Sequence, residues 1–289
     1  MSIQYNSQYV DEKYLPILEP NLYTDTVIIP GVTYTDKYQT GPAGQLYVHK
    51  ITKGDRVVPG TPGRDFTDVA AADSLIQIAL NNNFQKSTKI YGVQENAVAF
   101  NMGEAYMANS IQVVRESRQY SALGCMVYEG TVEASTSAIS TSAAAVNALL
   151  SMRQEIKDNY GQANFALVNT EIYKLFLNEV GFVVKTDPAT RNAELLRRFG
   201  INIYECNSFD NSTAKYYDYT GTLKTVVLSN VEMIVGYNEA MSIVSNLEAM
   251  RVVSSENFVG SKAQIELNCG FRVTSKDQII VKSKGSISA

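Results

Sequence analysis

The residue types that most often do chemistry are sparse in this chain. His49 is the single histidine, and the three cysteines, Cys125, Cys206 and Cys269, stand far apart in the sequence. A Ser-His-Asp or Cys-His arrangement could use only His49, which lies beside Lys50 and is expected to face solvent from a strand. Zinc sites and disulfide frameworks need clustered or paired cysteines, so we expect three buried, reduced thiols.

Two glycine-rich segments are the next candidates for chemistry. Residues 41–44 (GPAG) and 59–63 (PGTPG) lack the Lys-Ser or Lys-Thr ending that a phosphate-binding loop requires. Catalysis otherwise needs a nucleophile with its base, paired carboxylates or a metal cluster. The sequence therefore predicts a protein that is not an enzyme and that uses no cofactor or metal.

Composition narrows the class of protein further. The chain is 45% hydrophobic and 19% charged, with a formal net charge of -4. A protein that reads DNA sequence would carry a concentrated basic face, so this balance argues against one. The chain shows neither an apolar run long enough for a membrane span nor a signal peptide at its start.

The front third of the chain must position His49 and the glycine-rich segments. Residues 45–66 have strand character and contain a Gly54-Asp55 turn, which predicts a two-stranded ribbon. Residues 67–93 predict a returning strand and a connector. An isolated ribbon is marginally stable, and its unpaired edge invites pairing with another chain.

Residues 1–30, which precede this ribbon, have a different composition and pattern. Pro16, Pro20 and Pro30 interrupt them, and they show no helical period. They contain too many apolar residues for a disordered tail. We therefore expect an extended arm that lies along something else.

Helical spacing begins after this front third. Apolar residues recur over about 96–120 and predict a long helix, and a second helix is predicted over about 141–159, with Ser140 or Thr141 as its N-cap. Elements of both kinds follow. They are a strand at 165–168, a helix capped by Asn169 or Thr170, a short helix at 193–199, and strands at 201–204, 225–228 and 233–235.

The C-terminal region gives the clearest period-two signal. Ala263, Ile265, Leu267, Cys269, Phe271 and Val273 alternate with polar residues or glycine, which predicts one long strand with a single buried face. A turn at 275–277 leads into a second strand at 278–282. We expect these two strands to close the fold as a pair.

The order of these parts resembles the major capsid proteins of tailed bacteriophages, which have the Hong Kong 97-type fold. The local stretches that carry the resemblance are FALVNTEIYKLFL (165–177), LLRRFGINIYECNSF (195–209) and GSKAQIELNCGFRVTSKDQIIVKS (260–283). The resemblance implies an α+β, Hong Kong 97-type capsid fold. Its implied parts are an N-terminal arm (1–32), an extended β-hairpin loop (33–93), a peripheral domain with the long spine helix (94–164 and 255–289) and an axial domain (165–254).

The resemblance also implies a function. The chain would be a major capsid protein that self-assembles through pentamers and hexamers into an icosahedral shell around the packaged double-stranded DNA of a tailed bacteriophage. The missing partner of the ribbon would then be the neighbouring subunit. The expected inter-subunit contacts are Leu46, Val48, His49, Lys50, Ile51, Val57, Val58 and Phe66 in the extended loop, and Tyr14, Leu15, Ile17 and Tyr23 in the arm.

Partners and location follow from the same resemblance. The expected partners are other copies of the chain, a portal protein, and scaffolding or decoration proteins. The chain would lie close to DNA without specific contacts, and no membrane is involved. The protein would belong to the virion after assembly in the host bacterial cytoplasm. The alternative is an encapsulin-type bacterial nanocompartment shell protein that holds enzyme cargo. Encapsulins typically begin with a cargo-docking helix, so the proline-interrupted start favours the phage interpretation.

Two further possibilities remain open. A ligand-binding α+β module would have no use for an arm and a ribbon ahead of the first strong helix. Some members of the capsid family join subunits by a lysine–asparagine isopeptide bond, and Lys50, Lys53, Asn268 and Glu266 supply the matching residue types. Lysines are also common on exposed ribbons, where they protect the edge, and that is the reading we expect for Lys50 and Lys53.

Overall fold

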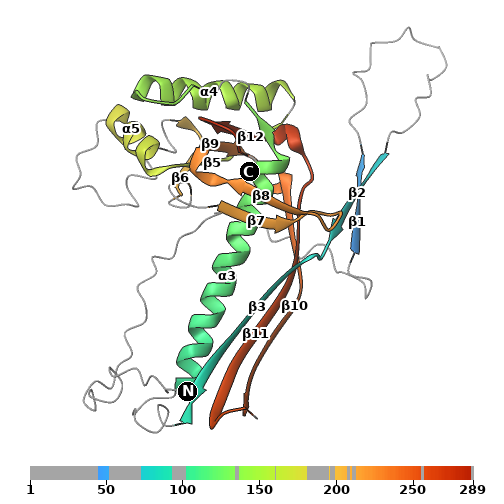
Figure 1. Ribbon diagram of the computed structural model, residues 1–289. Coiled ribbons are helices and arrows are strands. Elements are labelled where there is room, and N and C mark those ends of the chain that lie inside the picture. The colour runs from blue at the N-terminus through green and yellow to red at the C-terminus, as the bar shows by residue number, and fades with distance from the viewer. Residues whose placement is uncertain are drawn as a thin grey trace, which may run out of the picture.

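The computed structural model describes residues 45–51, 73–92, 102–133, 137–159, 161–180, 195, 199–206, 209, 213–254 and 257–287. They form a long, narrow lower part and a broader upper part (Figure 1). The arm expected at 1–32 lies outside the described residues.

The lower part consists of a helix packed along a sheet. Helix α3 (Met102–Glu129) lies beside an antiparallel three-stranded sheet in the order β10 (Met241–Ser254), β11 (Gly260–Val273), β3 (Asn82–Tyr91) (Figure 1). The alternation predicted for β11 is confirmed, because all six of its apolar residues are buried. Strand β10 was not predicted, since its register shifts between Ser245 and Leu247 and interrupts the period of two.

Helix α3 also extends further than its sequence pattern indicates. The predicted helix ended near residue 120, whereas α3 continues to Glu129. Residues 121–127 near its end are all buried, so they show no amphipathic period (Ser121, Ala122, Leu123, Cys125, Met126 and Val127). Gly124 fits here because a Cβ would lie 2.8 Å from the Cβ of Ala214.

The upper part is a five-stranded mixed sheet between two layers. Its order is β4 (Thr131–Val132), β12 (Ile279–Ser283), β9 (Val231–Gly236), β5 (Phe165–Val168), β6 (Asn202–Glu205). Helices α4 (Ser142–Asp158) and α5 (Thr170–Val180) cover one face. The end of α3 and the hairpin of β7 (Thr213–Tyr217) and β8 (Leu223–Val227) lie on the other. Short 3-10 turns occupy Leu228–Asn230, Asn238–Ala240 and Lys276–Gln278.

Alternate side chains of this sheet pack into two separate hydrophobic cores, one on each face. Ala166 and Val168 pack with α4 and α5, whereas Phe165 and Leu167 pack with α3 and the β7–β8 hairpin. The predicted strand at 165–168 and the helix of 141–159 are confirmed. The predicted caps are resolved as well: the side chain of Thr141 accepts from the Ala144 N–H, and Oδ1 of Asn169 accepts from the Ile172 N–H at 2.8 Å.

Two sequence-based expectations need correction in this region, and a third can be checked only in part. Strands β11 and β12 do not pair, because β12 joins β4 and β9 in the five-stranded sheet. The polar, tyrosine-rich stretch before residue 225, for which no strand was predicted, contains strand β7. Of the short helix expected at 193–199, only Leu195 and Phe199 are described, and both are helical and buried.

A ribbon is present, and its second described strand lies beyond residues 45–66, within the predicted returning segment of 67–93. Strand β1 (Gln45–Ile51) pairs antiparallel with β2 (Asp73–Ala79), from Gln45 opposite Ala79 to Ile51 opposite Asp73. The predicted Gly54-Asp55 turn lies outside the described residues. The sequence could not reveal this pairing, because it depends on a register set across the intervening residues 52–72.

Candidate assembly surface on the ribbon

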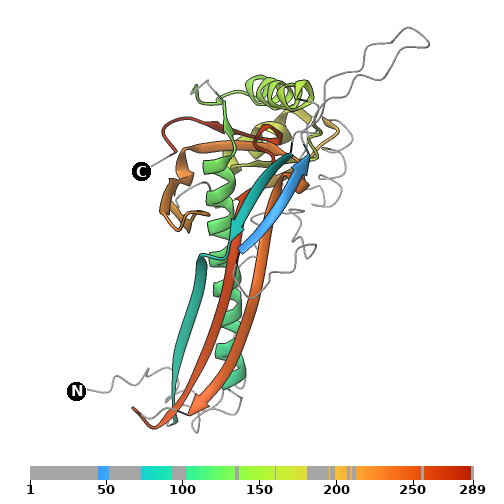
Figure 2. The same cartoon turned by 90° about the vertical axis from the view of Figure 1, so that its right-hand side faces the viewer.

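The ribbon of β1 and β2 lies on the face of the long sheet opposite α3. Figure 2 shows β2 crossing β11 there, and β2 continues into β3 through Leu80 and Asn81. Gly270 of β11 makes this crossing possible, because a Cβ at that position would lie 2.7 Å from the carbonyl oxygen of Ala79. The base of the ribbon is therefore packed on its own chain.

One face of the ribbon is directed towards the body. Residues directly opposite each other in an antiparallel pair share a face, so Leu46 and Ile78 lie together, as do Val48 and Ile76. Ile78 is 1% exposed, while Leu46, Val48 and Ile76 are half-buried. The predicted contact residues Leu46 and Val48 thus share their face with residues that this chain itself covers.

The opposite face carries two exposed apolar side chains that sequence reasoning missed. Tyr47 is 50% exposed and Leu75 is 56% exposed. They lie diagonally across the pair, since Tyr47 pairs with Gln77 and His49 pairs with Leu75. Alternation along β1 indicated that Tyr47 and Leu46 point in opposite directions, but which of them faces outward depends on the β2 crossing.

For the remaining predicted contact residues, the structure gives either the strand pairing alone or no description. His49, Lys50 and Ile51 belong to β1, where they pair with Leu75, Ser74 and Asp73. Val57, Val58 and Phe66 of the extended loop, and Tyr14, Leu15, Ile17 and Tyr23 of the arm, lie outside the described residues. For all of these, an inter-subunit contact stays a prediction.

The residues matched to isopeptide chemistry do not form a suitable acid site. Such a bond needs a buried acid to take the lysine proton. Glu266 is instead only half-buried on the polar face of the long sheet. The side-chain amides of Asn83, at 2.7 Å, and Gln85, at 3.1 Å, donate to its Oε1 and lower its pKa. The lowered pKa makes Glu266 a weaker acceptor for the lysine proton than a buried acid would be.

A buried charged pair lies where α3 meets the long sheet. Glu129 Oε1 is 2.7 Å from Nη1 of Arg272, and its Oε2 accepts from the Val273 N–H at 3.0 Å. Burial raises the pKa of Glu129, and the contacts with Val273 and Arg272 only partly oppose that rise. Arg272 also lies over the ring of Tyr219 at 4.0 Å, so the pair connects α3 and β11 to the tip of the β7–β8 hairpin.

The cysteines are buried, as expected, and all three are free thiols. Burial, followed by the nearby charge of Glu129, raises the pKa of Cys125 well above its usual value. Within the described ranges, no group of three or more His, Cys, Asp and Glu residues could hold a metal ion. No helix in that part of the chain is long and apolar enough to cross a membrane.

Comparison with known proteins assigns the fold. No protein-family model and no curated protein matches the sequence. A structure from Mycobacterium phage Che8 superposes with a TM-score of 0.67 at 17% identity, over 94% of this chain and 96% of that one. The capsid of the cyanophage P-SCSP1u gives a TM-score of 0.64 at 14% identity, over 85% of this chain and 84% of that one. The fold is therefore that of tailed-phage capsid proteins.

A particle of another origin shares this fold. A virus-like particle from Pyrococcus furiosus gives a TM-score of 0.54 at 14% identity, over 83% of this chain and 86% of that one. The mixed helix-and-sheet architecture thus occurs both in phage capsid structures and in this virus-like particle. The likeness covers nearly the full length of the chains that are compared.

Proposed function

We propose that this chain is the major capsid protein of a tailed bacteriophage. It would self-assemble through pentamers and hexamers into an icosahedral shell around packaged double-stranded DNA. The observation that carries the proposal is the ribbon, which turns Tyr47 and Leu75 outward although both are large and apolar. A pair of strands with one packed face and one exposed apolar face has a use when a second copy covers it.

The parts of the fold take their roles from this proposal. We assign α3 as the spine helix of a Hong Kong 97-type fold, residues 1–32 as the arm and 33–93 as the extended loop. Residues 94–164 and 255–289 would form the peripheral domain, and residues 165–254 the axial domain. The pairing of β10 with β11 supports moving residues 241–254 from the axial to the peripheral domain.

Ring formation follows from the geometry of such contacts. A ribbon that each subunit donates to one neighbour is a head-to-tail contact, which closes into rings when the rotation permits. Besides the ribbon residues, we assign contacts to the arm through Tyr14, Leu15, Ile17 and Tyr23. Portal, scaffolding and decoration proteins are proposed as further partners, with assembly in the bacterial cytoplasm and DNA held without specific contacts.

The second candidate is an encapsulin-type compartment shell that holds enzyme cargo, and the match to the Pyrococcus furiosus particle supports it. The two candidates share self-assembly and differ in content. Particles isolated from their native source would contain the phage genome in one case and a folded enzyme in the other. The proline-interrupted residues 1–30 support the phage alternative.

Electron microscopy of the purified chain tests the shared step. We expect closed shells from the unmodified protein and dispersed chains from the double variant Tyr47→Ser/Leu75→Ser. Leu150→Ser is the matched control, because Leu150 on α4 is 47% exposed and lies away from the ribbon. Normal shells from the double variant would exclude the ribbon as the contact, and an unmodified protein that never assembles would exclude the shell function.

A further inference from the structure

We propose that Asn82 is a positioning residue that fixes the direction in which the ribbon leaves the body, by tying the bend between β2 and β3 to the β7–β8 hairpin. This inference rests on the proposed function, in which the ribbon contacts a neighbouring subunit. It adds a specific link between that contact and the hairpin beside α3. Four observations carry it.

The first observation is the abrupt change of partner at the bend. Strand β2 pairs with β1, and β3 pairs with β11, yet only Leu80 and Asn81 separate the two strands. Asn82 opens β3 opposite Cys269 and is 3% exposed. Any rotation about this bend would swing the whole ribbon, so the interactions of residues 81 and 82 set its direction.

The second observation is a two-point contact of Asn82 with the hairpin. Its Nδ2 donates to the carbonyl oxygen of Tyr217 at 2.9 Å, and its Oδ1 accepts from the N–H of Tyr217 at 2.8 Å. The side chain amide thus acts as a peptide group added to the outer edge of β7. Asn81 extends the contact, because its Nδ2 donates to the carbonyl oxygen of Asp218 at 2.8 Å.

The third observation is that the hairpin tip is held firmly. Oδ1 of Asp218 accepts from the N–H groups of Thr220 and Thr222, both at 2.9 Å, and from the Thr220 hydroxyl at 2.6 Å. Arg272 covers the neighbouring Tyr219 ring. The hairpin therefore offers its two carbonyl groups from a fixed position.

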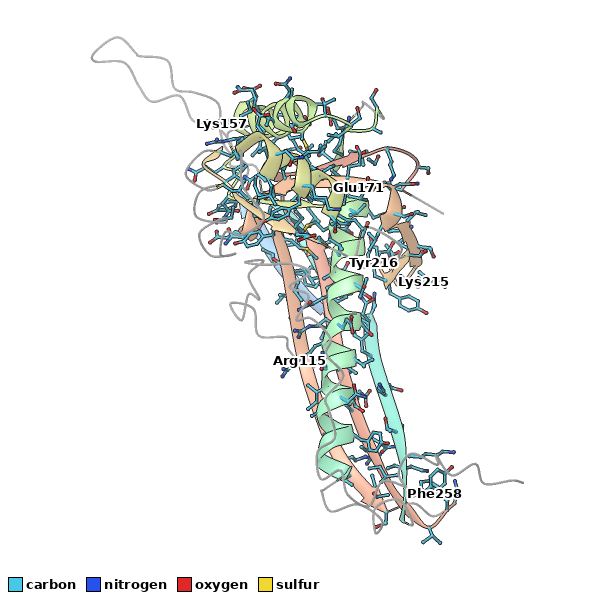
Figure 3. The ribbon with its side chains drawn as sticks, turned by 90° about the vertical axis from the view of Figure 1, so that its left-hand side faces the viewer. Arg115, Lys157, Glu171, Lys215, Tyr216 and Phe258 are labelled. Carbon is cyan, nitrogen blue, oxygen red and sulfur yellow. The ribbon has the colours of Figure 1, made fainter. Side chains whose placement is uncertain are left out.

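The fourth observation connects the hairpin to α3. Oγ of Ser121 on α3 donates to the carbonyl oxygen of Lys215 at 2.8 Å, and Figure 3 shows Lys215 and Tyr216 beside the upper part of α3. Tyr216 is 1% exposed. On the other side of the bend, the close approach of Ala79 to Gly270 leaves no space for displacement towards β11. The ribbon is thus fixed from two sides.

Residue-resolved hydrogen exchange tests the contact without requiring assembly. The experiment uses the full chain with Tyr47→Ser/Leu75→Ser, compared with and without Asn82→Leu. Leucine has a similar size but can neither donate nor accept, so we expect the Tyr217 amide to exchange roughly tenfold faster, with amides of β1 and β2 also less protected. Amides of α4 should not change, which shows that the chain is still folded.

Two further variants separate the contact from a general loss of stability. Asn83→Leu is the matched control, because the Asn83 amide bonds to Glu266 on the opposite face, away from the hairpin. It should leave the Tyr217 amide protected. Asn82→Asp keeps the acceptor but places an oxygen against the Tyr217 carbonyl, so it should loosen the ribbon even if Asn82→Leu fails to fold.

The same variants, made in the chain that keeps Tyr47 and Leu75, test the effect of the contact on shell assembly. We expect Asn82→Leu and Asn82→Asp to produce shells of several sizes, and Asn83→Leu to produce shells of one size in electron micrographs. Unchanged exchange at Tyr217 in Asn82→Leu, or one shell size in every variant, would overturn the inference. If the unmodified chain forms no shells, the proposed function fails, while the exchange measurement still decides whether the contact positions the ribbon.

Discussion

Phe271 shows how a single side chain fixes the buried face of β11. It is 2% exposed and packs edge to face against Phe84, with ring centroids 6.4 Å apart. Phe271→Asp would bury an unpaired charge and leave a cavity, and truncation of a buried phenylalanine alone costs about 3–5 kcal/mol. We expect this variant not to fold, as judged by circular dichroism. Gln264→Asp, on the polar face of the same strand, should fold. Soluble, folded Phe271→Asp protein would show that the buried face of β11 has been assigned wrongly.

Glu129 links stability to pH in a definite direction. Burial raises its pKa in the folded chain above its ordinary value of 4.5. Its contribution to stability is therefore complete below about pH 4.5 and is lost as the pH rises through the raised value. The free energy of unfolding of the wild type, minus that of Glu129→Gln, should fall as the pH rises through this window. A difference that grows as the pH rises would contradict a raised pKa for Glu129.

At the scale of elements, the ribbon can be shortened without disturbing its base. Tyr47 pairs with Gln77, and the next pair towards the body is Leu46 with the buried Ile78. Replacing residues 48–76 by Asn-Gly would join Tyr47 to Gln77 through a two-residue hairpin turn. We expect an unchanged circular dichroism spectrum in the helical region and no shells by size-exclusion chromatography. Shells of normal size from this variant would show that the distal ribbon is dispensable.

At the scale of the whole molecule, assembly should raise thermal stability. Contacts between folded chains stabilise the folded state by mass action. We expect the Tm of the shells to exceed that of dispersed Tyr47→Ser/Leu75→Ser by at least ~5 °C, given that about 1 kcal/mol shifts Tm by a few degrees in chains of this size. Scanning calorimetry at one heating rate measures the difference. Equal Tm values would mean that the ribbon contact contributes little to stability.

Several elements could be predicted from local sequence patterns alone. The apolar stripe of α4 with Thr141 at its start, the buried run of β5 followed by the Asn169 cap, and the alternation of β11 all follow from spacing and side-chain type. Local spacing is sufficient there because each of these elements has one consistent buried face.

The way in which these elements combine could not be predicted from local patterns and is seen only in the folded chain. The pairing of β1 with β2, the placement of β12 in the second sheet and the contact of Asn82 with Tyr217 join residues far apart in the chain. Period-two alternation states that Tyr47 and Leu46 face opposite ways, but not which one is outside. That choice depends on β2 crossing Gly270, where the missing side chain lets two strands approach, and such long-range contacts leave no periodic trace in the sequence.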